Sequence, residues 1–154
     1  VLLAVYAVGM FTDVLSKEVA LAVLMPIPAS MGGIAGTQTL TLVIRGLALG
    51  QIGKSNARWL IVKEVAVAAL NGIVWAVIVA FVAIFVFSEW YIGIFLGIAL
   101  MVNLLCAAVV GFTIPFILKK MGIDPALAGS VIVTTITDIL GYVTFLGMAT
   151  LYLF

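Results

Sequence analysis

Long apolar stretches that carry almost no charge are the feature that most constrains how this chain can fold. A helix crosses the hydrocarbon core of a bilayer with about 20 mainly apolar residues. The chain offers such stretches at 20–49, 64–87, 90–118 and 126–154, and a shorter one at 1–12. This pattern predicts an all-α polytopic membrane protein with five transmembrane helices, the first too short to cross alone and therefore interpreted as truncated.

The composition excludes several other classes of protein. Hydrophobic residues make up 66% of the chain and charged residues only 8%, whereas a soluble domain carries about 25% charged residues. Disorder requires low hydrophobicity and high charge, so it is excluded as well. A net charge of +1 with no clustered basic face argues against nucleic acid as a partner.

The chain also has few of the side chains that usually serve in catalysis or bind metals. The chain has no histidine, and Cys106 is its one cysteine. A Ser-His-Asp triad, a zinc site built on histidine and a cysteine metal cluster are therefore excluded. We expect that the protein is not an enzyme.

Basic residues set the predicted topology, because lysine and arginine favour the cytoplasmic side of short connections. The connections at 50–63 and 119–124 hold Lys54, Arg58, Lys63, Lys119 and Lys120. The connections on the opposite side hold only Lys17. We predict a multi-pass protein of the cell membrane, surrounded by lipid, with a cytoplasmic N-terminus and an external C-terminus.

One carboxylate interrupts the last apolar stretch. Asp138 lies about 20 Å along the helix expected there, well inside the bilayer. A centred aspartate costs about 2.5–3.5 kcal/mol on insertion scales, so it usually has a role in transport or pairing. Residues three and four positions apart share a helix face. Around Asp138 the helix carries the hydroxyls of Ser130, Thr134, Thr135 and Thr137.

A second polar face is expected on the stretch at 20–49. It consists of Ser30, Gly33, Thr37 and Thr41, with Gln38 beside them. Pro26, Pro28 and the Gly32-Gly33 pair should kink or loosen this helix, as is tolerated where backbone lines a wet cavity. Gly32 and Gly36 also fit a common helix-packing motif. Together with Asp138, the second face favours a polar pathway between the second and fifth helices.

The chemistry of these residues suits a hard cation. Hydroxyl, carbonyl and carboxylate oxygens favour Mg²⁺, Ca²⁺ or Mn²⁺ over soft metals. Mg²⁺ dehydrates reluctantly and usually keeps several waters, so one carboxylate per chain can hold it through those waters. Two chains on a two-fold axis would bring two copies of Asp138 to one ion.

Other polar residues are expected to have structural roles. Asp124 as the N-cap and Pro125 at the first helical position start the last helix. Arg45 is expected either to extend to the interface or to ring the inner mouth of the pathway. Glu64 is expected either to be mostly solvated at a cytoplasmic helix end or to attract cations at that mouth. Asn71 and Asn103 are expected to be buried amides that form hydrogen bonds between helices.

The motifs that carry these features resemble a known family. The chain contains Met-Gly-Gly-Ile-Ala-Gly-Thr-Gln at 31–38, Arg45-Gly46, and Asp124-Pro-Ala-Leu followed by Thr134-Thr135 and Asp138. In combination these segments resemble the membrane domain of the MgtE family of magnesium channels and transporters, over nearly the whole chain. The resemblance implies a homodimer in which the second and fifth helices line an ion path at the dimer interface.

The resemblance also implies roles for individual residues. Asp138 corresponds to the family's central site for hydrated Mg²⁺, the transported ion, and Thr134 and Ser130 face the same site. The second pore helix is lined by Gly33, Gly36, Thr37 and Thr41. Residues 1–154 are interpreted as a single MgtE-like transmembrane domain without the family's cytoplasmic N-domain and CBS domains, so gating by that sensor is not expected.

Two further functions stay open beside a Mg²⁺ channel. A Na⁺- or H⁺-coupled Mg²⁺ exchanger would use Asp138 as a relay, as intramembrane acids often do. A non-transporting assembly module would use Asp138 only to pair with another chain. The sequence also leaves Mn²⁺ and Ca²⁺ open as competing ions.

Overall fold

The computed structural model describes residues 1–153, and their regular secondary structure is entirely helical. The helices are α1 (Leu2–Gly9), α2 (Thr12–Lys17), α3 (Val19–Leu24), α4 (Pro26–Ala48), α5 (Ala57–Phe87), α6 (Trp90–Lys120) and α7 (Pro125–Leu153). Four candidate spans are long and apolar enough to cross a membrane: α3 continued by α4, then α5, α6 and α7. The prediction of an all-α polytopic membrane protein is confirmed. The expected first span is the short helix α1 followed by the start of α2, and the last residue of the expected fifth span, Phe154, lies outside the described residues.

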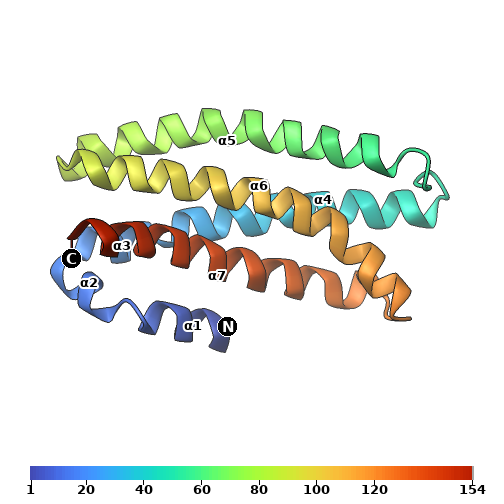
Figure 1. Cartoon of the computed structure of the whole chain (residues 1–154), viewed down its shortest axis with the longest axis horizontal. Coiled ribbons are helices and arrows are strands. Elements are labelled where there is room, and N and C mark those ends of the chain that lie inside the picture. Colours follow the sequence, from blue (N-terminus) through green and yellow to red (C-terminus); the bar gives the residue numbers. More distant parts are fainter. Residues whose placement is uncertain (154) are drawn as a thin grey trace.

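The four long helices run side by side along the long axis of the molecule (Figure 1). Helix α6 is the central element, because α4, α5 and α7 all pack against it. Helix α5 packs mainly on α6, and α1 packs against α7. The connections at 49–56 and 121–124 lie at one end of the bundle, and the connection at 88–89 lies at the other (Figure 1). The two basic connections therefore share one end.

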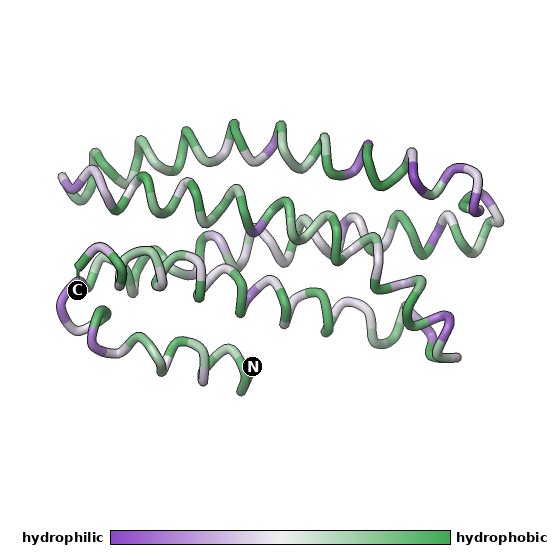
Figure 2. The backbone as a smooth tube through the Cα atoms, in the orientation of Figure 1, coloured by the Kyte–Doolittle hydropathy of each residue, from purple (hydrophilic) through white to green (hydrophobic). Residues whose placement is uncertain are grey.

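Helix α5 (Ala57–Phe87) extends into the basic segment that the sequence assigned to a loop. Helix α5 begins at Ala57, so the expected loop at 50–63 is helical over its last seven residues, and that boundary was wrong. Lys63 Nζ lies 5.3 Å from the ring centroid of Trp59, a cation–π contact, and tryptophan is enriched at membrane interfaces. Hydrophilic positions gather at the two ends of the bundle, and hydrophobic ones dominate the helices between them (Figure 2).

Two helix starts follow their sequence signals. Asp124 Oδ1 accepts a hydrogen bond of 2.9 Å from the backbone N–H of Ala126, which confirms the expected N-cap of α7. The second span breaks at Met25, and Pro26 and Pro28 lie in the first turn of α4, where a missing N–H is tolerated. The helix then runs without interruption through Gly32 and Gly33, so the expected loosening at that pair was wrong.

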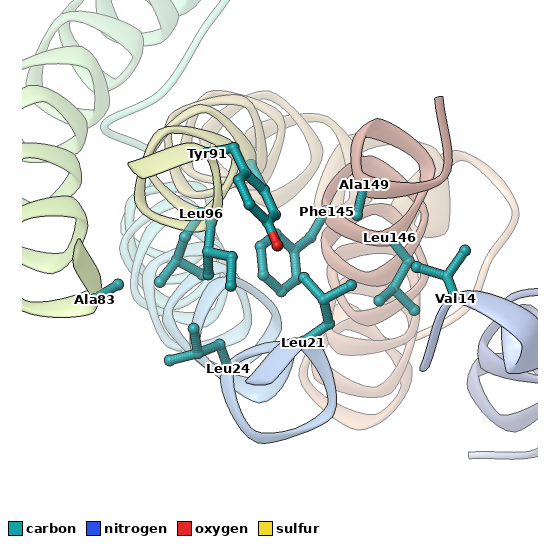
Figure 3. Packing of buried hydrophobic residues seen from close by; sticks show 11 residues of the cluster. Val14, Leu21, Leu24, Ala83, Tyr91, Leu96, Phe145, Leu146 and Ala149 are labelled. Atoms are coloured by element: carbon teal, nitrogen blue, oxygen red, sulfur yellow. The ribbon is translucent and has the colours of Figure 1, made fainter. Parts of the chain in front are cut away.

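Large apolar side chains fill the end of the bundle that holds the 88–89 connection. Leu21 of α3, Leu96 of α6 and Phe145 and Leu146 of α7 are all 0% exposed. Tyr91 packs with them, as Figure 3 shows. This cluster ties α3 to α6 and α7 at that end.

Toward the middle of the bundle, glycines let the helices approach closely. A Cβ atom added at Gly111 of α6 would collide with the carbonyl oxygen of Gly36 of α4. A Cβ at Gly36 would lie 2.6 Å from Cγ1 of Val133 on α7. The small residues therefore bring the backbone of α4 close to the backbone of α6 and to a side chain of α7, as is common in membrane bundles.

Candidate functional site

An open groove of about 480 Å³ lies between α4 and α7 and contains the intramembrane acid, Asp138. Its lining residues are Ala29, Ser30, Gly33, Ile34, Thr37 and Gln38 from α4, and Thr134 and Asp138 from α7. Asp138 is half-buried there, and Thr134 is exposed. Residues from both polar faces inferred from the sequence thus meet in one groove.

Two glycines of α7 hold that helix against α4 on either side of the acid. A Cβ at Gly129 would lie 2.9 Å from Cδ1 of Leu40, and a Cβ at Gly141 would lie 2.9 Å from the backbone nitrogen of Ala29. Both contacts are closer than a real side chain permits. Thr134 and Asp138 lie between these glycines in the sequence, so they are held beside α4.

The hydroxyls near Asp138 divide into two groups. Thr137 is fully buried and donates to the carbonyls of Val133 and Thr134, both at 3.0 Å. Thr135 donates to the carbonyl of Val131 at 2.7 Å. These two hydroxyls serve their own helix, which is the usual fate of threonine in a membrane helix. The groove itself has the hydroxyls of Ser30, Thr37 and Thr134.

A second groove, of about 590 Å³, continues the first toward the basic end of the bundle. The two grooves share Thr37 and Gln38. The second is also lined by Thr41 and Arg45 of α4, and by Gln51 and Asn56 of the following connection. A polar track therefore runs along α4 from the level of Asp138 to the end of the helix.

Sequence reasoning missed the part played by the connection after α4. Asn56 Oδ1 accepts a 2.8 Å hydrogen bond from the N–H of Gly53, and its Nδ2 donates to the carbonyl of Gln51 at 2.6 Å. These bonds fold the connection back so that its polar side chains line the second groove. The available signal was an asparagine at the N-cap position of the next helix, a residue type favoured there.

The structure brings together most of the residues selected from the sequence. Gly33, Thr37, Thr134 and Asp138 line the first groove, and Thr41 lines the second. Gly36 is buried instead against Val133 and Ala107. Ser130 is half-buried one turn before Thr134, outside the lining of these two grooves.

Behind the first groove lies the side chain of Asn103 on α6. It is 0% exposed, and its Nδ2 donates a 2.5 Å hydrogen bond to the carbonyl oxygen of Pro28 on α4. The expected hydrogen bond between helices is confirmed. Within residues 1–153, its Oδ1 has no hydrogen-bond partner, and burying an acceptor in this way costs about 1–3 kcal/mol.

Glu64 of α5 differs from the sequence expectation. Its carboxylate is not mostly solvated: the residue is half-buried, and Oε2 accepts a 3.2 Å hydrogen bond from Oγ1 of Thr39 on α4. Both residues line a cleft of about 210 Å³ between α4, α5 and α6, together with Gln38 and Asn71. A polar link between α4 and α5 therefore lies beside the polar track.

The donor set of the first groove suits a cation that keeps its water. No three His, Cys, Asp or Glu side chains gather into a metal-binding group anywhere in the described chain. The groove offers one carboxylate and several hydroxyls. Such oxygens are hard donors, and they can accept hydrogen bonds from the waters of a hydrated ion.

Comparison with known proteins identifies similar sequences. Residues 25–148 match the family model MgtE, described as a divalent cation transporter. The magnesium transporter MgtE of Bacillus subtilis is 35% identical over 146 residues, which are 95% of this chain and 32% of that protein. The protein of the same name from Thermus thermophilus is 31% identical over 143 residues, 93% of this chain and 32% of that protein. The chain thus spans about a third of the length of these curated relatives.

Proposed function

Because the chain belongs to the MgtE family of divalent cation transporters, we propose that it carries Mg²⁺ across a membrane along the groove between α4 and α7. The observation that carries this proposal is the meeting of Asp138 and Thr134 with Ser30 and Thr37 in one open groove. An acid within a membrane span is costly unless it serves an ion path or a partner. Attraction between the carboxylate and a divalent cation offsets that cost.

The ion passes Asp138 in hydrated form. Mg²⁺ keeps several waters when protein ligands are few, and a single carboxylate cannot replace its whole shell. In this proposal Asp138 attracts the ion, while hydroxyl oxygens accept hydrogen bonds from its waters. Those hydroxyls belong to Thr134, Ser30 and Thr37. Mn²⁺ and Ca²⁺ are the competing ions to test, because they favour the same oxygen donors.

The complete pore is formed by a homodimer. The first groove is open on one side of the single chain, and one carboxylate balances only half the charge of a divalent cation. A second copy related by a two-fold axis closes the groove and adds a second Asp138. Ser130, one turn before Thr134, is predicted to face the ion path in that assembly, as is the second pore helix from Gly33 to Thr41.

The second groove is the cytoplasmic vestibule of this pathway. It shares Thr37 and Gln38 with the first groove and reaches Arg45 at the end of α4. The end of the bundle on which it opens holds the basic connections, which favour the cytoplasmic side. An ion that leaves Asp138 toward the cytoplasm therefore follows Thr37 and Thr41.

Flux through purified protein in liposomes tests the proposal. Asp138→Asn should lower Mg²⁺ flux about tenfold or more, since it removes the charge and keeps the shape. Glu89→Gln, which neutralises an exposed acid outside the grooves, is the matched control and should keep the parent's flux. Parent-level flux in Asp138→Asn would contradict the assignment. Flux driven by voltage alone identifies a channel, whereas strict dependence on a Na⁺ or H⁺ gradient identifies the coupled exchanger.

A further inference from the structure

We propose that Asn103 is a positioning residue for the Asp138 groove: its buried amide sets how α4 and α7 sit beside that groove. The inference rests on the proposed function, since it concerns the same ion path. Helix α6 contributes no lining residue to the groove, whose walls come from α4 and α7. Asn103 therefore acts on the ion only through the two helices that it contacts.

The first contact is the hydrogen bond from Asn103 Nδ2 to the carbonyl oxygen of Pro28. Pro28 directly precedes Ala29 and Ser30, which line the groove. This turn of α4 has few bonds of its own, because Pro26 and Pro28 lack the N–H groups that would bind the preceding turn. The helix also breaks at Met25 just before it. The amide thus supplies from α6 a restraint that the first turn of α4 cannot supply itself.

The second contact is steric and involves two glycines. A Cβ at Gly32 would collide with the Asn103 amide, and a Cβ at Gly141 would lie 3.0 Å from its Nδ2. Gly32 precedes Gly33 of the groove wall, and Gly141 follows Asp138 by one helical turn. The amide therefore fits between α4 and α7 at the level of the acid, in space that both glycines leave open.

The unpaired Oδ1 indicates that the useful group of the Asn103 side chain is its Nδ2, which donates a hydrogen bond to Pro28. Asn103 Oδ1 is buried without a partner among residues 1–153, an arrangement that an apolar side chain of similar size would avoid. Buried polar atoms left unpaired are rare in native proteins. The Nδ2 bond to Pro28 is the contact that an apolar replacement would lose.

Asn103→Leu in the full chain, measured in liposomes, tests this role, with Asn71→Leu as the matched control. Asn71 is also an amide within a span, but the expectation that it is buried was wrong, because it is exposed on α5. Asn103→Leu should raise the Mg²⁺ concentration for half-maximal flux about fivefold and lower the preference for Mg²⁺ over Ca²⁺, because the groove loses its set width. Asn71→Leu should leave both quantities at the parent values. A mere loss of folded protein would lower maximal flux and leave both quantities unchanged.

A compensating pair keeps the test decisive if Asn103→Leu folds poorly. Gly32→Ala alone should lower flux, because its methyl group collides with the amide. Adding Asn103→Ala removes the collision, so the double variant should exceed Gly32→Ala in flux. If the flux losses of the two single changes simply multiplied in the double variant, the inference would be overturned. It would also be overturned if folded Asn103→Leu kept the parent's Mg²⁺ concentration for half-maximal flux and the parent's preference for Mg²⁺ over Ca²⁺. A parent chain without Mg²⁺ flux would instead overturn the proposed function, and this inference with it.

Discussion

Gly33 of α4 faces Thr134 of α7 across the wall of the first groove, with room for one methyl group between them. A Cβ at Gly33 would lie 3.7 Å from Thr134 Cγ2, an ordinary van der Waals contact. Three residues later, a Cβ at Gly36 would lie only 2.6 Å from Val133 Cγ1. Neighbouring glycines of one motif therefore serve different purposes, one in the groove and one in helix packing.

The first prediction follows from this difference. Gly36→Ala should lower the free energy of unfolding by about 1–3 kcal/mol, because the methyl group overpacks the contact with α7. Gly33→Ala should leave it unchanged or raise it by up to about 1 kcal/mol, because alanine favours a helix. Unfolding in mixed detergent micelles measures both. Equal destabilisation by the two variants would contradict the different packing of these glycines.

The two groups of hydroxyls give a second prediction. Thr134→Val should weaken Mg²⁺ binding about threefold to tenfold, because it removes a groove oxygen that we propose accepts a hydrogen bond from ion-bound water. Thr137→Val should leave binding unchanged, since that hydroxyl is fully buried and bonds to its own helix. Mg²⁺-dependent shifts of the thermal unfolding midpoint report both affinities. Equal weakening in the two variants would count against the assignment of Thr134.

A third prediction concerns the link between α4 and α5. Thr39→Val removes the hydroxyl that donates to Glu64 and should cost about 1–3 kcal/mol, because the carboxylate loses a partner in a half-buried site. In the background of Glu64→Ala, which leaves no side-chain acceptor for Thr39, the same change should cost less. The double-mutant cycle isolates the coupling between the two side chains, and strictly additive costs would show that the bond is not formed.

The helix start at Asp124 gives a fourth prediction. Asp124→Ala should lower the free energy of unfolding by about 0.5–2 kcal/mol through loss of the cap on the Ala126 N–H. Asp124→Asn keeps a capping oxygen and should recover most of that loss. Circular dichroism during thermal unfolding follows both variants. If Asp124→Ala and Asp124→Asn were equally stable, the capping oxygen would contribute little to the stability of the protein.

The sequence anticipated the long helices and the central acid because both leave strong local signals. An apolar stretch long enough for a bilayer predicts a helix at 90–118 wherever its neighbours lie. Asp138 stands out because its surroundings in the sequence are apolar. The start of α5 at Ala57 was missed because polar residues end an apolar stretch of sequence without ending the helix.

Helix geometry explains which residues of each polar face reach the groove. Each residue turns the helix by about 100°, so positions four apart drift by about 40°. Ser130, two such steps before Asp138, is turned by about 80° and lies outside the groove lining. Gly36 is turned by about 60° from Gly33, to the side opposite Thr37, and so meets Val133. A spacing of three or four residues in the sequence therefore identifies a helix face, but it does not distinguish the residues that line the groove from Ser130 and Gly36, which lie beside it.

Contacts between helices were the least predictable part of the site. The bonds from Asn103 to Pro28 and from Thr39 to Glu64 depend on the depth and rotation of two helices at once. A single sequence shows that an amide or an acid lies within a span, and its partner is decided by packing. The glycines that set this packing, such as Gly111 opposite Gly36, carry no mark that distinguishes them from other glycines.

The most direct test of the ion path is to locate a bound cation in the assembled protein. Mn²⁺ favours the same oxygen donors as Mg²⁺, and its anomalous scattering identifies its position in a crystal. The proposed pathway predicts one peak on a two-fold axis between two copies of Asp138, separated from both carboxylates by water and lost in Asp138→Asn. Mn²⁺ bound elsewhere while the α4–α7 grooves of both copies face lipid would contradict it.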